Sequence, residues 1–245
     1  MTAKFLTADW RYLGMLNYEV DPVMLRSHLP AGTELDDYDG RHFISLVGFL
    51  FLDTHVLSLP AFFHQNFEEV NLRFYVRRSA GGGTRSGVVF LRELVARPLV
   101  AEMAKLTYNE PYRTVPMQHT ILDTSGELQC VEYQFGGPGD QCRMTLHVES
   151  PLEPVSPGSL EEFLSHRQWG YTTQRDGGTI EYRVEHPHWN IWPNARWELD
   201  GPLREFYDEP FATILNKGPS SAFIAEGSAV AVHLPERIVQ PRSPI

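Results

Sequence analysis

The chain carries the stretch FEEVNLRFYV at residues 67–76, which alternates apolar and polar side chains with the two-residue period of a β-strand. One face of this strand holds Val70, Leu72, Phe74 and Val76. The other face holds Glu69, Asn71, Arg73 and Tyr75. A glycine-rich segment at 79–84 separates it from a second apolar stretch at 87–97. The two stretches are therefore predicted to pair as a β-hairpin.

Further strand patterns recur along the chain, and the predicted helices are few and short. Apolar periodicity and turn residues predict strands at 10–20, 43–52, 117–123, 127–135, 141–149, 179–185, 195–199 and 221–233. Helices are predicted at 22–28, 98–108, 159–166 and 202–207. Residues 43–52 are apolar almost throughout, which indicates a strand buried on both faces. We therefore expect a mainly β, α+β fold as a single domain over residues 1–245, with a tail from about residue 235.

Charge and cysteine content narrow the classes of partner. The 245 residues have a formal net charge of -10 and a pI near 5.4, which argues against a nucleic-acid or membrane-surface partner. No stretch is long and apolar enough to predict a membrane span, and residues 1–10 do not resemble a secretory leader. The predicted hairpin of 127–135 and 141–149 places Cys130 and Cys142 on opposite faces, so we expect free thiols and a cytoplasmic protein. A small organic ligand is the expected partner, and self-association into a homo-oligomer is compatible with the sequence.

Several segments carry a family resemblance. LVGF at 46–49, FEEVNLR at 67–73, GVVF at 87–90 and YNEPY at 108–112 resemble the YqjF-like family of uncharacterised conserved bacterial proteins. That family is in turn similar to acetoacetate decarboxylase. The resemblance implies a closed antiparallel β-cone or barrel around a small-molecule cavity, with a few short helices.

The same resemblance raises a question about the decarboxylase lysines. Acetoacetate decarboxylases carry Arg-Glu-Leu-x-Ala-x-Pro followed by two lysines, whereas here RELVARP at 92–98 is followed by Leu99 and Val100. The chain is therefore expected to lack the Schiff-base lysine pair. Lys105, one to two helical turns further on, is the alternative nucleophile if it points back into the cavity.

Candidate site residues follow from the polar face of 67–76. If this face is inward, Glu69, Asn71 and Arg73 line the cavity. A hairpin register that places Arg73 opposite Glu93 would also pair Glu69 with Arg97. Glu69 and Glu93 are the predicted catalytic acid and base, and the predicted substrate-binding residues are Asn71, Arg73, Arg92, Tyr108 and Glu110. Alternation by itself favours a polar stripe that faces solvent, and it is the family resemblance that makes an inward face equally compatible with the sequence.

The leading functional hypothesis is a small-molecule-binding β-cone protein, a lyase- or hydrolase-like enzyme acting on a small carboxylate or carbonyl compound. The alternative is a non-catalytic ligand-binding or sensing module. His186 and His188 lack a third ligand at matching spacing, so no metal site is expected. No phosphate-binding loop or dinucleotide fingerprint is present, and no cofactor is expected.

Overall fold

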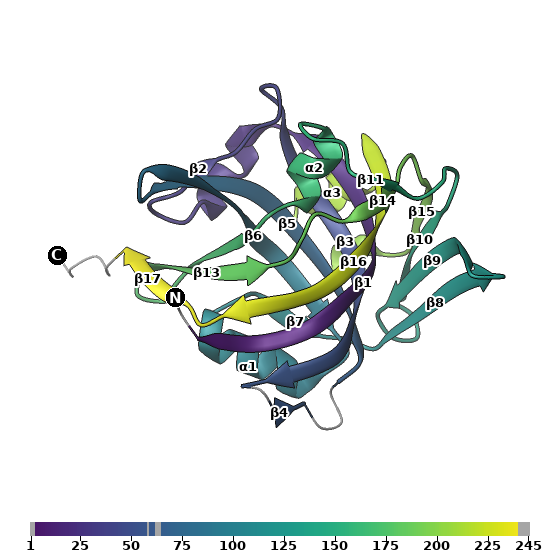
Figure 1. Cartoon of the computed structure of the whole chain (residues 1–245), viewed down its shortest axis with the longest axis horizontal. Coiled ribbons are helices and arrows are strands. Elements are labelled where there is room, and N and C mark those ends of the chain that lie inside the picture. Colours follow the sequence, from purple (N-terminus) through teal and green to yellow (C-terminus); the bar gives the residue numbers. More distant parts are fainter. Residues whose placement is uncertain (1–2, 58, 62–64, 240–245) are drawn as a thin grey trace.

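The computed structural model describes residues 3–57, 59–61 and 65–239, and most of them belong to two β-sheets (Figure 1). The larger sheet contains β1 (Lys4–Val20), β2 (Glu34–Leu35), β3 (His42–Val56), β4 (Leu59–Pro60), β5 (Phe67–Ala80), β6 (Gly83–Val95), β7 (Tyr112–Thr114), β11 (Glu153–Pro154), β12 (Trp169–Thr173), β13 (Thr179–Glu185), β14 (Asn190–Trp192), β16 (Ser221–His233) and β17 (Glu236–Val239). The smaller sheet contains β8 (Met117–Thr124), β9 (Glu127–Phe135), β10 (Cys142–His147) and β15 (Arg196–Asp200).

Helices are short and lie around the larger sheet. They are α1 (Pro98–Tyr108), α2 (Leu160–Ser165) and α3 (Phe211–Leu215), with the 3-10 turns η1 (Pro22–Met24), η2 (Arg26–His28) and η3 (Leu203–Glu205). In the view of Figure 1, α1 lies at the bottom of the curled sheet and α2 at the top. None of the helices in the described residues is long and apolar enough to cross a membrane.

The larger sheet curls into a cone-like ring, as the family resemblance implies. Neighbouring strands follow the order β16, β1, β3, β5, β6, β12, β13, and β13 pairs again with β16 through Val184 and Val232. These pairs are antiparallel except that between β6 and β12, which is parallel. Gly87 permits this approach, since a Cβ atom there would lie 2.5 Å from the carbonyl oxygen of Trp169.

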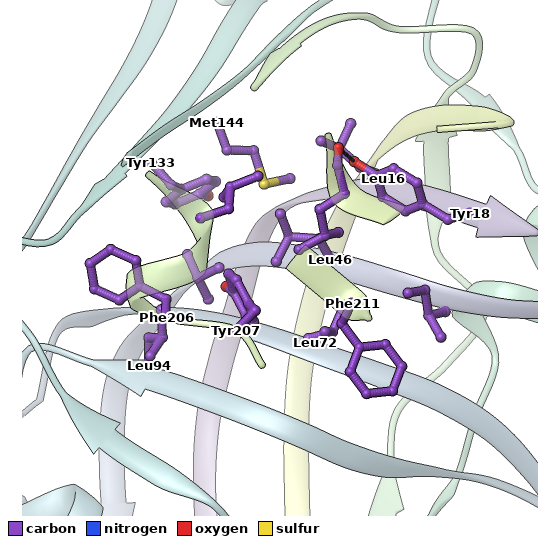
Figure 2. Close-up of a cluster of buried hydrophobic side chains, with 14 of the residues drawn as sticks. Leu16, Tyr18, Leu46, Leu72, Leu94, Tyr133, Met144, Phe206, Tyr207 and Phe211 are labelled. Carbon is purple, nitrogen blue, oxygen red and sulfur yellow. Dashed lines mark hydrogen bonds between the residues drawn. The ribbon is translucent and has the colours of Figure 1, made fainter. Parts of the chain in front are cut away.

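An apolar core fills the space between the ring and the smaller sheet. Leu16, Leu46 and Leu72 from the outer face of the ring pack with Tyr133 and Met144 of the smaller sheet (Figure 2). Aromatic residues from the segment around η3 and α3 complete this outer core: Phe206, Tyr207 and Phe211. The next residues along β3, Val47 and Phe49, belong to a second apolar cluster on the inner face. Residues 43–51 of β3 are all buried, which confirms the predicted burial on both faces.

Two sequence predictions about chain organisation are wrong. The predicted tail contains β17, whose pairing with β13 satisfies backbone groups that a free tail would expose to water; residues 240–245 lie outside the described residues. The predicted hairpin register also fails, because Asn71 lies opposite Glu93 and Arg73 lies opposite Phe90. Leu91 is an extra residue on β6 at this point, so the hairpin contains a β-bulge that shifts the register.

Candidate functional site

A cavity of about 110 Å³ lies among side chains from the ring strands and α1. Aromatic residues form much of its wall, including Trp10, Phe49, Phe51, Phe90 and Trp169. On one side α1 contributes Val100, Met103 and Ala104. Because most of the lining is apolar, charges inside the cavity are poorly solvated and act on one another strongly.

The polar face of β5 points into this cavity. Glu69, Asn71 and Arg73 all line it, and their exposed fractions are 2%, 2% and 7%. A solvent-facing stripe, which the alternation left open, is therefore ruled out. Burial of these groups requires compensating partners from the protein or from a ligand.

Three glutamates meet in the cavity wall. Glu69 accepts hydrogen bonds from Asn71 Nδ2 at 3.0 Å and from the Tyr112 hydroxyl at 3.1 Å. Glu110, just beyond α1, accepts from Thr172 Oγ1 at 2.5 Å and from the Tyr182 hydroxyl at 2.7 Å. Glu93 on β6 lies opposite Asn71, and it also lines the cavity.

Burial shifts the acidity of all three carboxyl groups. It raises the pKa of Glu69 to about 7, although the hydrogen bonds from Asn71 and Tyr112 oppose the shift. Burial likewise raises the pKa of Glu110 to about 7. The pKa of Glu93 rises well above its ordinary value because of burial, with further contributions from the charges of Glu110 and Glu69. Carboxyl groups of this kind can donate or accept protons near neutral pH.

Arg73 carries an unpaired charge in the same cavity. Its Nη2 donates to the Leu164 carbonyl at 3.1 Å, its Nε has no hydrogen-bond partner, and no carboxylate of the described residues forms an ion pair with it. Arg167, a second arginine in the lining, has its Nη1 2.5 Å from Asp36 Oδ2. Arg73 is thus the cation in this wall that remains available to an anionic ligand.

The other predicted site residues divide between cavity and surface. Tyr108 and Glu110 line the cavity, and the Tyr108 hydroxyl donates to the His233 carbonyl at 3.1 Å. Arg92 does not line it, because its partner in the hairpin is Leu72 of the outer face, and its Nη2 lies 3.4 Å from Asp208 Oδ2. A substrate-binding role for Arg92 therefore has no geometric support.

The lysines lie away from the cavity. Lys105 Nζ is 2.8 Å from Glu102 Oε1 on the surface of α1. Lys4 and Lys217 are exposed, and no lysine occurs in the cavity lining. The alternative in which Lys105 points inward is contradicted by this placement.

Sequence reasoning missed several groups that complete the site. Thr172 and Tyr182, which hold Glu110, come from β12 and β13, and β12 was not predicted as a strand. Arg167 precedes β12 and was likewise not proposed for the site. The polar and aromatic content of 167–173 is the local signal for Arg167 and Thr172, and Tyr182 lies on the predicted strand 179–185. The hydrogen bonds from Thr172 and Tyr182 to Glu110 join segments more than 60 residues apart, so they leave no local pattern.

The histidines that were considered as metal ligands contact neighbouring backbone and side-chain groups instead. His186 Nδ1 lies 2.9 Å from the Pro187 carbonyl and Nε2 lies 3.2 Å from the Arg167 carbonyl. His188 Nε2 is 3.0 Å from Glu162 Oε1. Within the part of the chain that the structure describes, no group of three or more histidine, cysteine or acidic side chains is arranged to hold a metal ion.

Comparisons with known proteins extend these observations. The model of the DUF2071 family, described as an uncharacterized conserved protein, matches residues 7–229. The chain is 25% identical over 194 residues to the uncharacterized protein YqjF of Bacillus subtilis (strain 168), a match that covers 78% of this chain and 76% of that protein.

Solved structures with the same fold include enzymes. Acetoacetate decarboxylase from Legionella pneumophila subsp. pneumophila str. Philadelphia 1 superposes with a TM-score of 0.70 at 11% identity, over 97% of this chain and 88% of that chain. The enduracididine biosynthesis enzyme MppR complexed with pyruvate gives 0.65 at 13% identity, over 97% and 91%. An acetoacetate decarboxylase-like enzyme from Sphingomonas wittichii RW1 gives 0.64 at 15% identity, over 96% and 93%. At these identities the likeness establishes a shared fold.

Proposed function

The chain belongs to the DUF2071 family and has the acetoacetate decarboxylase-like fold, and from this premise we propose that its cavity binds a small carboxylate or carbonyl compound. In this proposal Arg73 anchors the carboxylate of the ligand, and Glu69 or Glu93 transfers a proton. The reaction is of the lyase or hydrolase kind.

The unpaired guanidinium of Arg73 is the observation that carries this proposal. A buried cation without a carboxylate partner costs folding free energy, and a ligand carboxylate would offset that cost with charge-assisted hydrogen bonds. The MppR structure with pyruvate supports a small carboxylate as the type of ligand that this fold accommodates.

The glutamates supply the proposed proton transfer. Glu69 lies two residues from Asn71 and four from Arg73 on the same inward face, so a ligand anchored at Arg73 extends toward it. Because no lysine lines the cavity, the proposed chemistry uses carboxyl groups and forms no Schiff base with the protein.

Thermal unfolding in the presence of acetate, propionate, pyruvate and acetoacetate tests the anchor. At a ligand concentration of about 100 times Kd, binding stabilises the folded state by about 2.7 kcal/mol, which raises Tm. We expect this rise for wild type and for Arg92→Ala, a control in the same hairpin whose arginine faces away from the cavity. Arg73→Ala should show no such rise in Tm. Equal rises in Tm for Arg73→Ala and Arg92→Ala would place the ligand elsewhere.

Turnover distinguishes catalysis from binding. NMR spectra of acetoacetate, the compound of this panel with an activated C–C bond, should show cleavage over time by wild type and none by Glu69→Gln or Glu93→Gln. Binding without conversion in wild type would instead support the non-catalytic binding or sensing module.

A further inference from the structure

Two glutamates of the cavity wall present carboxyl oxygens that lack donors. Glu110 accepts two hydrogen bonds at Oε1, while its Oε2 is buried and has no hydrogen-bond partner among the described residues. Glu93 Oε2 is buried and unpartnered in the same way. Both residues are at least nine-tenths buried, at 2% and 5% exposure for Glu93 and Glu110. Buried oxygens of this kind need a donor, and the cavity is the place from which one can come.

The charges of the lining residues also favour a cation beside these glutamates. Among the described residues that line the cavity, the acidic ones are Glu69, Glu93 and Glu110. The basic ones are Arg73 and Arg167, and Asp36 already offsets Arg167. The carboxyl groups therefore outnumber the available guanidinium groups, and a ligand with a positive charge would stabilise their ionised form, which burial otherwise disfavours.

Aromatic rings surround the same glutamates. The Tyr108 and Tyr182 rings meet edge to face with centroids 4.7 Å apart, and the Tyr182 hydroxyl bonds to Glu110. Tyr112 reaches Glu69 from the neighbouring β7. Aromatic faces attract cations, and the attraction grows when both groups are removed from water.

We infer that the ligand is zwitterionic, with a carboxylate at Arg73 and a protonated amine or similar cationic N–H group between Glu93 and Glu110. This inference rests on the proposed anchoring at Arg73 and narrows the ligand to an amino-carboxylic acid. Glu93 lies opposite Asn71, which is two residues from Arg73 on β5, so about 7 Å separates the Cα atoms of Asn71 and Arg73. Since the side chains of Arg73 and Glu93 both reach the cavity, a short carbon chain separates the two charged groups of the ligand.

Matched pairs of compounds test the inference on the intact protein. Isothermal titration compares ω-amino carboxylates with two to five methylene groups against the unsubstituted carboxylates of equal length. We expect the best amino carboxylate to bind wild type at least about tenfold more tightly than its match, the size of one charged hydrogen bond. Equal or weaker binding of every amino compound overturns the inference while the carboxylate anchor stands.

Variants locate the preference for the amine. Glu110→Gln and Glu93→Gln keep the shape of the side chain and remove its charge, so in these variants the ratio of the affinities for an amino carboxylate and its unsubstituted match should fall from about tenfold toward one. Glu102→Gln on the exposed side of α1 is the matched control and should retain the preference. Loss of the preference in Glu102→Gln alone would contradict the assignment. If wild type binds neither class of compound, the anchor at Arg73 fails and the inference fails with it.

Discussion

The two faces of β5 are equally buried but differ in how their groups are satisfied. On the outer face Val70, Leu72 and Phe74 are at most 1% exposed and pack within the apolar outer core of Figure 2. On the inner face Asn71 Oδ1 and Arg73 Nε are buried and have no hydrogen-bond partner among the residues that the structure describes. One strand therefore combines a face that stabilises the fold with a face that costs stability.

This difference indicates that the inner face of β5 is the face that carries function. Apolar burial on the outer face needs no further explanation, because it removes side chains from water. Unpartnered polar atoms on the inner face lower stability and are retained at sites that a ligand completes. Mutations on the outer face should consequently lower stability, whereas mutations on the inner face should weaken ligand binding.

Truncation on the outer face should have the largest effect on stability. Phe74→Ala removes a fully buried ring from the outer core, and we expect the free energy of unfolding to fall by about 3–5 kcal/mol. Urea denaturation measures this loss, and the fraction that remains folded should keep its affinity for carboxylates. A loss below about 1 kcal/mol would mean that the outer core is loosely packed.

Removal of the buried charge of Arg73 should not lower the free energy of unfolding, in contrast to Phe74→Ala. Arg73→Met replaces a buried, unpaired guanidinium with an apolar side chain, and the free energy of unfolding should stay equal or rise by about 1–3 kcal/mol. Carboxylate binding should weaken by about tenfold or more. Urea denaturation and isothermal titration measure the two effects, and a destabilised variant would show that Arg73 supports the fold.

The pH dependence of stability should include a contribution from Glu69 on the inner face. The pKa of Glu69 rises from 4.5 to about 7 in the folded protein, so between these values the folded state binds more protons than the unfolded chain. Its contribution is therefore fully present below about pH 4.5 and is lost as the pH rises through about 7, with a slope of at most about 1.4 kcal/mol per pH unit for one proton. Urea denaturation from pH 4 to 8 should give a flatter curve for Glu69→Gln than for wild type. Parallel curves would show that Glu69 ionises normally.

The smallest change in the free energy of unfolding is expected for Lys105, which lies on α1 and on neither face of β5. Lys105→Ala removes a surface pair with Glu102, and the free energy of unfolding should change by less than about 0.5 kcal/mol.

Borohydride treatment in the presence of acetoacetate should leave the mass of wild-type Lys105 unchanged. A covalent adduct at this residue would restore Schiff-base chemistry as an explanation.

Local patterns were sufficient for many elements. The helix at 98–108 and the strands at 127–135, 179–185 and 221–233 occur with the predicted bounds, because turn residues and proline delimit each of them. The segment 22–28 instead forms two 3-10 turns, in which Asp21 caps Val23 as expected of an N-cap. The strand β12 was missed because its five residues lack a clear alternation.

The sequence predicted those residues of the candidate site that belong to one local pattern, such as one face of a strand. Glu69, Asn71 and Arg73 were found because they share one face of β5, and Glu110 because it ends a recognisable motif. Arg92 was misplaced because it lies next to Glu93 on β6, and successive strand residues point to opposite faces, so only one of the two can line the cavity. The bulge at Leu91 leaves no mark on composition, and the register after it places Glu93 on the inner face.

By itself, the sequence determined the β-rich class of this protein, the family resemblance and the separation of β5 into a polar and an apolar face, since all of these follow from local order. Only the tertiary structure decided that the polar face is buried, that Arg73 lacks a carboxylate partner and that Glu110 meets Thr172 and Tyr182. Closure of the ring between β13 and β16 brings distant segments around one cavity. The resulting loss of water makes the environment of each charge depend on neighbours far away in the chain.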